Sequence, residues 1–302
     1  MRVTNQTILR NSISRLQQNL QSVERAREDI ASGLRLRKMS QDPTSGAEVV
    51  RVGSSMRAID QFRRNIRMGV GRIDTEENVL NSVTNALGRG MELAISQASA
   101  TATAESRIAV QAEVDALINF TVGLANTRFG DDYVFGGTRG GEPPFRYPDV
   151  AGDFRALLDT GGNLVDPSGS IPLEIGDGRF ATSNHNGTEV FLDTNALESL
   201  RALSAALGAN DVPGITASID ALRNSSSDVQ TLIGRQGARA NEMMVAENNL
   251  GELELTLKAF RSELRDTEID KAMVELVGRQ TMYQAAMSAT SRVLGLSLAN
   301  YL

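Results

Sequence analysis

The residues that could carry chemistry are few and lie far apart. His185 is the one histidine among 302 residues, so a Ser-His-Asp arrangement would have to use it. It stands beside Asn186-Gly187, a turn dipeptide, and we therefore expect His185 to be a solvent-exposed turn residue. The chain has no Cys, which excludes disulfides, zinc–thiolate sites and thiol nucleophiles. We predict that the protein is not an enzyme.

Two further groups of residues deserve a chemical interpretation. Asp131-Asp132, and Asp149 with Asp153, could contact a cation, but their spacing is not that of an EF-hand loop. Residues 136–141, Gly-Gly-Thr-Arg-Gly-Gly, lack the Lys-Ser/Thr that completes a phosphate-binding loop. We expect solvated turns and a hinge at these places, and we expect no cofactor and no metal ion.

Composition limits the classes of partner. A net charge of −6 disfavours nucleic acid, which requires concentrated positive charge. No apolar run approaches the length of a membrane span, so we expect no membrane insertion. Residues 1–19 lack the continuous apolar stretch of a cleavable signal peptide. This pattern favours a cytoplasmic protein, or one that is exported by a route that needs no such peptide.

Both ends of the chain carry apolar residues at alternating spacings of three and four, which is typical of coiled-coil and bundle helices. The first helix should end near Gly33, and the second should begin at Ser45, with Glu48 completing a capping box. The second helix runs to about Ala98, and a third follows an interruption at 101–104. The helical pattern returns after Asn195 and continues to the end.

The middle of the chain has a different character. Nine of the thirteen aromatic residues and five of the seven prolines lie between Phe120 and Phe191, together with three Gly-Gly pairs and one Pro-Pro pair. Four short runs are typical of strands: 133–135, 154–158, 171–175 and 189–192. The sequence therefore predicts a small β-rich domain inserted into a helical chain.

We predict a mainly α fold in which both termini form one long antiparallel bundle or coiled coil. The expected domains are a terminal coiled coil (1–40 with 266–302), a helical core (41–140 with 195–265) and the inserted domain (141–194). A pair of helices buries only one stripe on each member, so we expect the outermost apolar residues to pack against neighbouring subunits. These predicted interface residues are Leu9, Ile13, Leu16, Leu20, Val23, Ile30, Leu34, Met273, Leu276, Tyr283, Met287, Leu294, Leu298 and Leu302.

Four stretches of this sequence resemble the flagellin superfamily, and within it the hook–filament junction family. Residues 30–43, Ile-Ala-Ser-Gly followed by Ser-Gln-Asp-Pro, are similar to a family signature in which Gln41 would be acidic. Residues 61–66 resemble the segment before the long second helix, and 124–137 resemble the exit from the helical core. The end, 284–302, is closer to the junction family than to filament flagellin because it closes with Asn-Tyr-Leu.

The resemblance implies a structural subunit of the bacterial flagellum, extracellular, on which flagellin assembles. It implies a homo-oligomeric ring between the hook-side junction protein (hook-associated protein 1) and flagellin. It also implies export through the flagellar apparatus without signal cleavage, and a cytoplasmic export chaperone. Filament flagellin is the closest alternative. A coiled-coil signalling or interaction protein shares the heptads but normally has a membrane span, and an enzyme in the inserted domain would need catalytic groups between Gly141 and Thr194.

Overall fold

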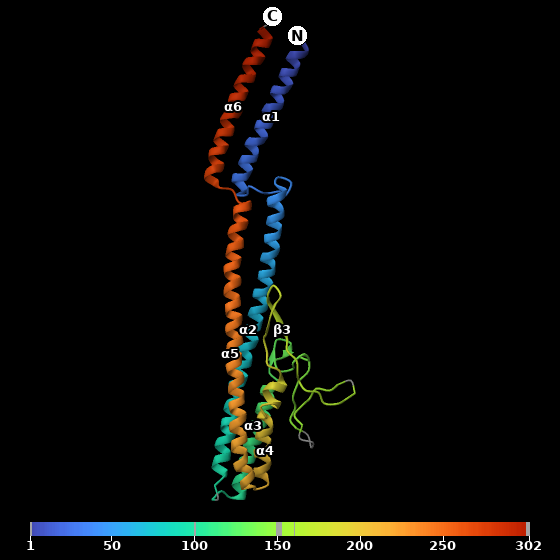
Figure 1. The fold of residues 1–302 in the computed structure, drawn as a ribbon, viewed down its shortest axis with the longest axis vertical. Coiled ribbons are helices and arrows are strands. Elements are labelled where there is room, and N and C mark those ends of the chain that lie inside the picture. The colour runs from blue at the N-terminus through green and yellow to red at the C-terminus, as the bar shows by residue number, and fades with distance from the viewer. Residues whose placement is uncertain (1, 100, 149–152, 160, 300–302) are drawn as a thin grey trace. The chain divides into compact units, whose positions relative to one another are not determined.

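The structure is a computed structural model that describes residues 2–99, 101–148, 153–159 and 161–299 (Figure 1). The side chains of residues 2–6, 8, 9 and 293–299 are outside that description. The chain divides into two compact units, each described by itself below. Unit 1 comprises Met1–Ala58 and Leu253–Leu302, and unit 2 comprises Ile59–Glu252.

Unit 1 is built from helices that belong to the two ends of the chain. Helix α1 (Arg2–Ser32) lies antiparallel beside helix α6 (Ile269–Ala299), so the N- and C-terminal ends of the pair lie together (Figure 1). The unit also contains the beginning of α2 (Pro43–Gln97) and the end of α5 (Val212–Arg265). Helix α1 ends where predicted, because Gly33 adopts a φ of +67°, which a side chain would disfavour.

The start of α2 differs from the prediction. The helix begins at Pro43 and not at Ser45, and Asp42 is the residue that caps it. Asp42 Oδ1 accepts a hydrogen bond from the Ser45 amide at 3.1 Å, while the Ser45 hydroxyl donates to Asp42 Oδ2 at 2.6 Å. Proline suits the first helical position because the amide it lacks would have had no helical partner there. Glu48 pairs instead with Arg51, so the predicted capping box is wrong.

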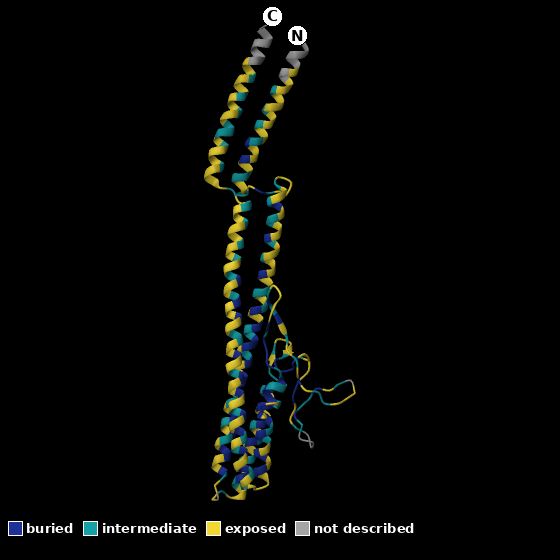
Figure 2. Cartoon of the chain, viewed as in Figure 1, coloured by how far each residue is buried: buried dark blue, intermediate teal, exposed yellow. Residues whose placement is uncertain are grey.

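Unit 2 contains a four-helix bundle. The remainder of α2 packs with α3 (Ala104–Ala125), α4 (Ala196–Gly208) and the first part of α5. The predicted interruption lies between α2 and α3, where the Thr103 hydroxyl accepts a hydrogen bond from the Ser106 amide and caps α3. In Figure 2, buried positions gather in this bundle. Its core includes the fully buried side chains Leu80, Leu87, Val114, Leu200, Leu203 and Val229.

The segment between α3 and α4 contains the predicted insertion, 141–194, and packs within unit 2. It holds two antiparallel pairs, β1 (Arg128–Phe129) with β2 (Asp132–Tyr133), and β3 (Pro172–Gly176) with β4 (Arg179–Thr182). Their register opposes Arg128 to Tyr133 and Leu173 to Ala181. The prediction of a mainly α fold with a small β-rich insertion is confirmed.

Of the four predicted strands, the structure contains only some. The run 171–175 coincides with β3, and of 133–135 only Tyr133 is in a strand. The run 154–158 makes isolated bridges at Arg155 and Leu158 and no strand. The run 189–192 lies in a π-helix, η1 (Thr188–Leu192), because the Asn186 side chain accepts a hydrogen bond from the Glu189 amide and starts a helical turn.

By length and composition alone, α3 is apolar enough to cross a membrane, although we expected no apolar run of that length. Core helices of bundles meet the same criterion, so this is weak evidence for a span. Val114, Ile118 and Val122 of α3 belong to the core of unit 2. The composition of α3 is that expected of a helix that buries one face in a bundle.

Candidate assembly surface

The two chain segments that lead into the α1–α6 pair are tied to each other by backbone hydrogen bonds. The amides of Arg35 and Leu36 donate to the Arg265 carbonyl at 2.8 and 3.1 Å, and the Thr267 amide donates to the Gly33 carbonyl at 2.9 Å. The Arg35 guanidinium adds a bond of 2.7 Å to the Leu264 carbonyl. Residues 33–36, which follow α1, are therefore fixed relative to residues 264–267, which precede α6. We call this contact the crossing.

Inside the pair, the apolar seam is short. Val23 and Ala26 of α1 are buried, and Leu36 is buried after the end of that helix. Arg279 of α6 donates to the Ser22 carbonyl at 2.9 Å and pairs with Glu275 on its own helix. Hydrogen bonds to Glu28 raise the pKa of the Arg37 guanidinium beside the crossing. The contact between α1 and α6 thus covers one stripe of each helix and leaves the other faces in solvent.

The predicted interface residues divide by their burial in the described structure. Val23 is buried, and Leu16, Ile30, Leu34, Leu276 and Tyr283 are half-buried. Four are exposed, at 46 % for Ile13, 42 % for Leu20, 52 % for Met273 and 49 % for Met287. The side chains of Leu9, Leu294 and Leu298 and all of Leu302 lie outside the described residues. Their role in subunit contacts stays a prediction.

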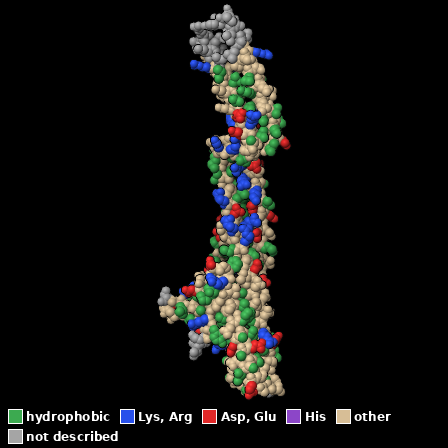
Figure 3. All heavy atoms as spheres, turned by 180° about the vertical axis from the view of Figure 1, so that it is seen from behind, with side chains coloured by type: hydrophobic (Ala, Val, Ile, Leu, Met, Phe, Trp, Pro, Cys, Tyr) green, Lys and Arg blue, Asp and Glu red, His purple; other side chains and the backbone are tan. Residues whose placement is uncertain are grey.

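Sequence reasoning missed the most exposed apolar residues of α6. Val274, Val277 and Met282 are 75, 61 and 68 % exposed, and Ile269 is also exposed. Three of the four stand next to residues of the predicted seam, in the adjacent pairs 273–274, 276–277 and 282–283. Such pairs signal two apolar stripes on one helix, whereas a two-helix contact needs one. Hydrophobic side chains are visible on the surface of the terminal helices in Figure 3.

Helix α5 shows where burial fades along one continuous seam. Met243, Ala246 and Leu250 are buried at the unit 2 end of the seam. In unit 1 the same seam continues with Leu253 and Phe260, which are exposed, and with Leu257 and Leu264, which are half-buried. Large apolar side chains left in solvent mark surfaces that bind other proteins. We take the exposed apolar residues of α1 and α6 as the candidate assembly surface.

His185 does not lie where we predicted. It is 1 % exposed and contacts Glu76 of α2, with 2.6 Å between His185 Nδ1 and Glu76 Oε1. The Gln236 amide of α5 donates to Glu76 Oε2 at 2.7 Å. Glu76 is fully buried, whereas its neighbour Glu77 is exposed. No described nucleophile contacts His185, so this arrangement is not a catalytic triad.

The other candidates for chemistry are structural in the described residues. A Cβ on Gly137, whose φ is +60°, would lie 2.0 Å from the Ser168 carbonyl oxygen, so Gly137 packs against the backbone of Ser168. Asp153 pairs with Arg155, whose hydrogen bonds hold the pKa of that carboxyl below its usual value. Asp131 and Asp132 are exposed, and Asp149 lies outside the described residues. The described part of the chain has no cluster of three His, Cys, Asp or Glu that could hold a metal ion.

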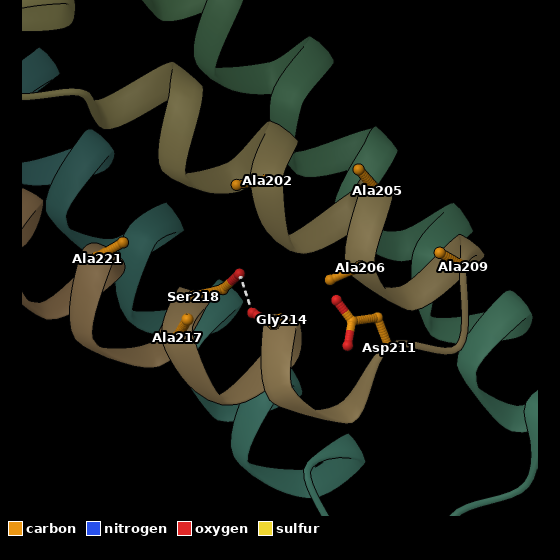
Figure 4. Close-up of a pocket in the computed structure, with 9 residues that line it drawn as sticks. All are labelled: Ala202, Ala205, Ala206, Ala209, Asp211, Gly214, Ala217, Ser218 and Ala221. Atoms are coloured by element: carbon orange, nitrogen blue, oxygen red, sulfur yellow. Dashed lines mark hydrogen bonds between the residues drawn. The ribbon is translucent and has the colours of Figure 1, made fainter.

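A shallow groove of about 520 Å³ lies between α4 and α5 in unit 2 (Figure 4). Alanines from both helices line it, with Asp211 and Gly214 at the connection between the helices. The Ser218 hydroxyl already donates to the Gly214 carbonyl at 2.9 Å, as the dashed line in Figure 4 marks. The lining holds one carboxylate and one hydroxyl, and no hydrogen bond among the described residues pairs them as a nucleophile and its base. The groove therefore offers no catalytic arrangement.

Comparison of the sequence and comparison of the fold with known proteins both find flagellar proteins. Residues 3–139 match the family described as bacterial flagellin N-terminal helical region. The flagellin of Halalkalibacterium halodurans is 24 % identical over 273 residues, with 89 % of this chain and 87 % of the relative covered. Flagellar hook-associated protein 3 of Escherichia coli K12 is 23 % identical over 297 residues and covers 90 % of each chain.

The fold also matches a solved structure. A putative flagellar hook-associated protein from Vibrio parahaemolyticus superposes with a TM-score of 0.64 at 18 % identity, over 75 % of this chain and 100 % of that one. At this identity the likeness concerns the fold alone. It supports a shared architecture of long helices contributed by both ends of the sequence.

Proposed function

Because this chain belongs to the flagellin superfamily, we propose that it is the structural subunit that joins hook and filament in the bacterial flagellum. It is a component of the flagellum that associates with other flagellar components. In its finer form, the proposal is that copies form a ring that binds the hook-side junction protein on one side. The opposite side presents a surface on which flagellin subunits assemble.

The observation that carries the proposal is the similarity to flagellar hook-associated protein 3 over 90 % of both chains. A similarity that covers 90 % of the chain does not depend on one helical end alone. The candidate assembly surface supports the same function. Exposed apolar residues such as Val274 and Met282 gain burial only if another protein covers them.

The proposal includes a route out of the cell. The subunit leaves through the flagellar export apparatus without a cleaved signal peptide. Until then, an export chaperone covers the exposed apolar residues of α6, since an amphipathic helix with such a stripe is a ligand for a hydrophobic groove. We assign the protein no cofactor, no catalytic role and no nucleic-acid partner.

Filament flagellin is the second candidate, because the flagellin of H. halodurans is 24 % identical over 89 % of this chain. It has the same architecture and would use the same terminal helices. The two functions differ in where the subunit lies and in how many copies each flagellum contains.

Gene deletion and electron microscopy separate the two candidates. For the junction subunit, we expect the deletion strain to keep its hooks and to release flagellin into the medium. An antibody to residues 141–194 should label one band where the filament meets the hook in the parent strain. Label along the whole filament would assign the chain to flagellin, and normal filaments after deletion would contradict both functions.

A further inference from the structure

The two units carry net charges of opposite sign. Unit 1 contains 16 Lys and Arg against 11 Asp and Glu, a net charge of +5, and unit 2 contains 15 against 26, a net charge of −11. The positive excess of unit 1 lies in one part of the terminal pair, residues 2–23 of α1 with 276–299 of α6, which we call the distal half. The distal half has no Asp or Glu, and its basic residues are Arg2, Arg10, Arg15, Arg279 and Arg292.

Three of these arginines have no carboxylate beside them in the pair. The hydrogen bond of 2.9 Å from Arg279 to the Ser22 carbonyl sets the register of the antiparallel helices, so residues before Ser22 lie beside residues after Arg279. Neither of these stretches contains an acidic residue. Arg10, Arg15 and Arg292 are exposed. Their charges are therefore balanced only by solvent ions while the chain is alone.

The part of the pair next to the crossing differs in this respect. Arg27 pairs with Glu24, and Lys271 pairs with Glu268. In Figure 3, blue and red side chains are mixed along this part of the terminal helices, whereas blue side chains without red ones lie next to the residues drawn in grey. The unbalanced positive charge therefore belongs to the distal half.

Large apolar side chains are exposed among these charges, and they lie on more than one side of the pair. The exposed set in the distal half is Ile13, Leu20, Val277, Met282 and Met287. At 3.6 residues per turn, Val277 and Met282 project about 140° apart around α6. A flat lipid surface contacts one side of a helix, whereas a protein that encloses the pair covers both side chains. The distal half of a second copy would bring the same arginines, and like charges repel.

We propose that the distal half is a docking surface for a different protein, whose contact surface carries carboxylates between apolar side chains. Carboxylates accept paired hydrogen bonds from guanidinium groups, and an apolar surface removes the exposed side chains from water. A partner with both features balances the charge of Arg10, Arg15 and Arg292 and covers the residues between them. This inference rests on the proposed function and deepens it, since it names the chemistry of the surface that covers the candidate assembly surface.

Binding of two synthetic peptides to the full chain tests the proposal. One is an amphipathic helical peptide of Leu, Ala and Glu, and the other has Gln at every Glu position. Although the chain has a net charge of −6, the Glu peptide should bind about tenfold more tightly at about 20 mM salt, as three exposed ion pairs allow. The difference should vanish near about 1 M salt, where charges are screened within about 3 Å. Fluorescence anisotropy of labelled peptides measures both affinities, and equal affinities at low salt would overturn the proposal.

Two triple variants with the same net charge locate the binding surface. The distal variant replaces exposed arginines of the distal half and combines Arg10→Gln, Arg15→Gln and Arg292→Gln. The control variant replaces exposed arginines elsewhere in unit 1 and combines Arg25→Gln, Arg27→Gln and Arg51→Gln. The distal variant should lose the tenfold preference for the Glu peptide, and the control variant should keep it. Equal loss in both variants would refute the proposal, because net charge would then explain the preference.

The same chains separate the other occupants. Self-association of the parent chain that disappears in the distal variant, measured by sedimentation, would assign the distal half to a second copy and contradict the proposal. Tighter binding to phosphatidylglycerol vesicles than to the Glu peptide would assign it to a lipid surface, with the same consequence. These assays use the purified chain. Their failure therefore leaves the deletion and microscopy tests of the proposed function unaffected, and the two proposals fail independently.

Discussion

Unit 2 and the terminal pair of unit 1 are built from the same kind of helix but differ in how much of it they bury. Leu80, Leu87 and Leu203 in the bundle are fully buried. In the terminal pair, Leu20, Met273 and Val277 remain between 42 and 61 % exposed. Figure 2 shows the same contrast, with few buried positions in α1 and α6. A four-helix bundle surrounds each helix with neighbours, whereas a pair covers one side.

The apolar stripes of the two regions therefore have two different roles, one in folding and one in association. In unit 2 the core side chains of the bundle, such as Leu80 and Leu87, are buried without a partner, so they stabilise a single molecule. In the terminal pair much of the apolar surface would contribute free energy only on assembly, at about 25 cal/mol for each Å² removed from water. Substitutions should therefore affect unfolding in one region and association in the other.

The largest effect on folding should come from the bundle core. We expect Leu87→Ala to lower the free energy of unfolding by about 2–5 kcal/mol, because it leaves a cavity among side chains that are fully buried. The matched change Leu20→Ala, in α1, should cost about 1 kcal/mol or less. Chemical denaturation followed by circular dichroism measures both. Equal losses would show that the two regions are equally packed.

A smaller effect is expected where the insertion packs on the bundle. A Cβ on Gly187 would lie 2.7 Å from the Phe145 ring, 2.8 Å from the Phe135 carbonyl oxygen and 2.8 Å from Pro167. Gly187→Ala should therefore cost about 1–3 kcal/mol, as overpacking of a filled site does. Proteolysis should detect it as faster cleavage of the insertion. Gly141→Ala, with open space around its Cβ position, is the control.

A pH effect should appear in unit 1, at the start of α2. Hydrogen bonds from Ser45 lower the pKa of Asp42 below its ordinary value of 3.8. A depressed pKa means that the cap stabilises the helix above that value and stops doing so as the pH falls through the lower, folded value. The carboxyl carbon of Asp42, followed by NMR from pH 7 to pH 2, should titrate below 3.8. Ser45→Ala should move the midpoint upwards, and an unchanged midpoint would contradict the cap.

The smallest effect on the monomer should follow changes at the candidate assembly surface. Replacing Val274, Val277 and Met282 by Ser should change the free energy of unfolding by no more than about 0.5 kcal/mol each, because these side chains are largely in solvent already. Association with flagellar partners should nevertheless be lost. Sedimentation of the monomer and filament attachment in cells measure the two effects. Normal attachment of the triple variant would remove these residues from the interface.

Local signals in the sequence predicted the helical layout well. Gly33 and Thr103 mark helix ends through their own conformation or their own hydroxyl, so neighbouring residues suffice to recognise them. The predicted start of α2 was two residues too late, because Asp42 and Ser45 are both good caps. The sequence alone does not show which backbone amide each side chain will bind.

The interior of the insertion and the assembly surface could not be predicted in the same way. His185 lies 109 residues from Glu76 along the chain, and Glu76 lies 160 residues from Gln236, so no local pattern reveals their contact. Periodicity shows which face of α6 is apolar, but the exposure of Val274 depends on how many helices surround it. The burial of a side chain depends on its tertiary neighbours, and heptad spacing does not show how many neighbours there are.

The crossing of residues 33–36 with 264–267 has a mechanical consequence. The backbone hydrogen bonds of Arg35, Leu36 and Thr267 connect the two passing segments, so tension applied through α1 and α6 is shared between two covalent paths. Sliding one segment past the other would break several of these bonds together, and such shear loading resists more force than opening bonds one at a time.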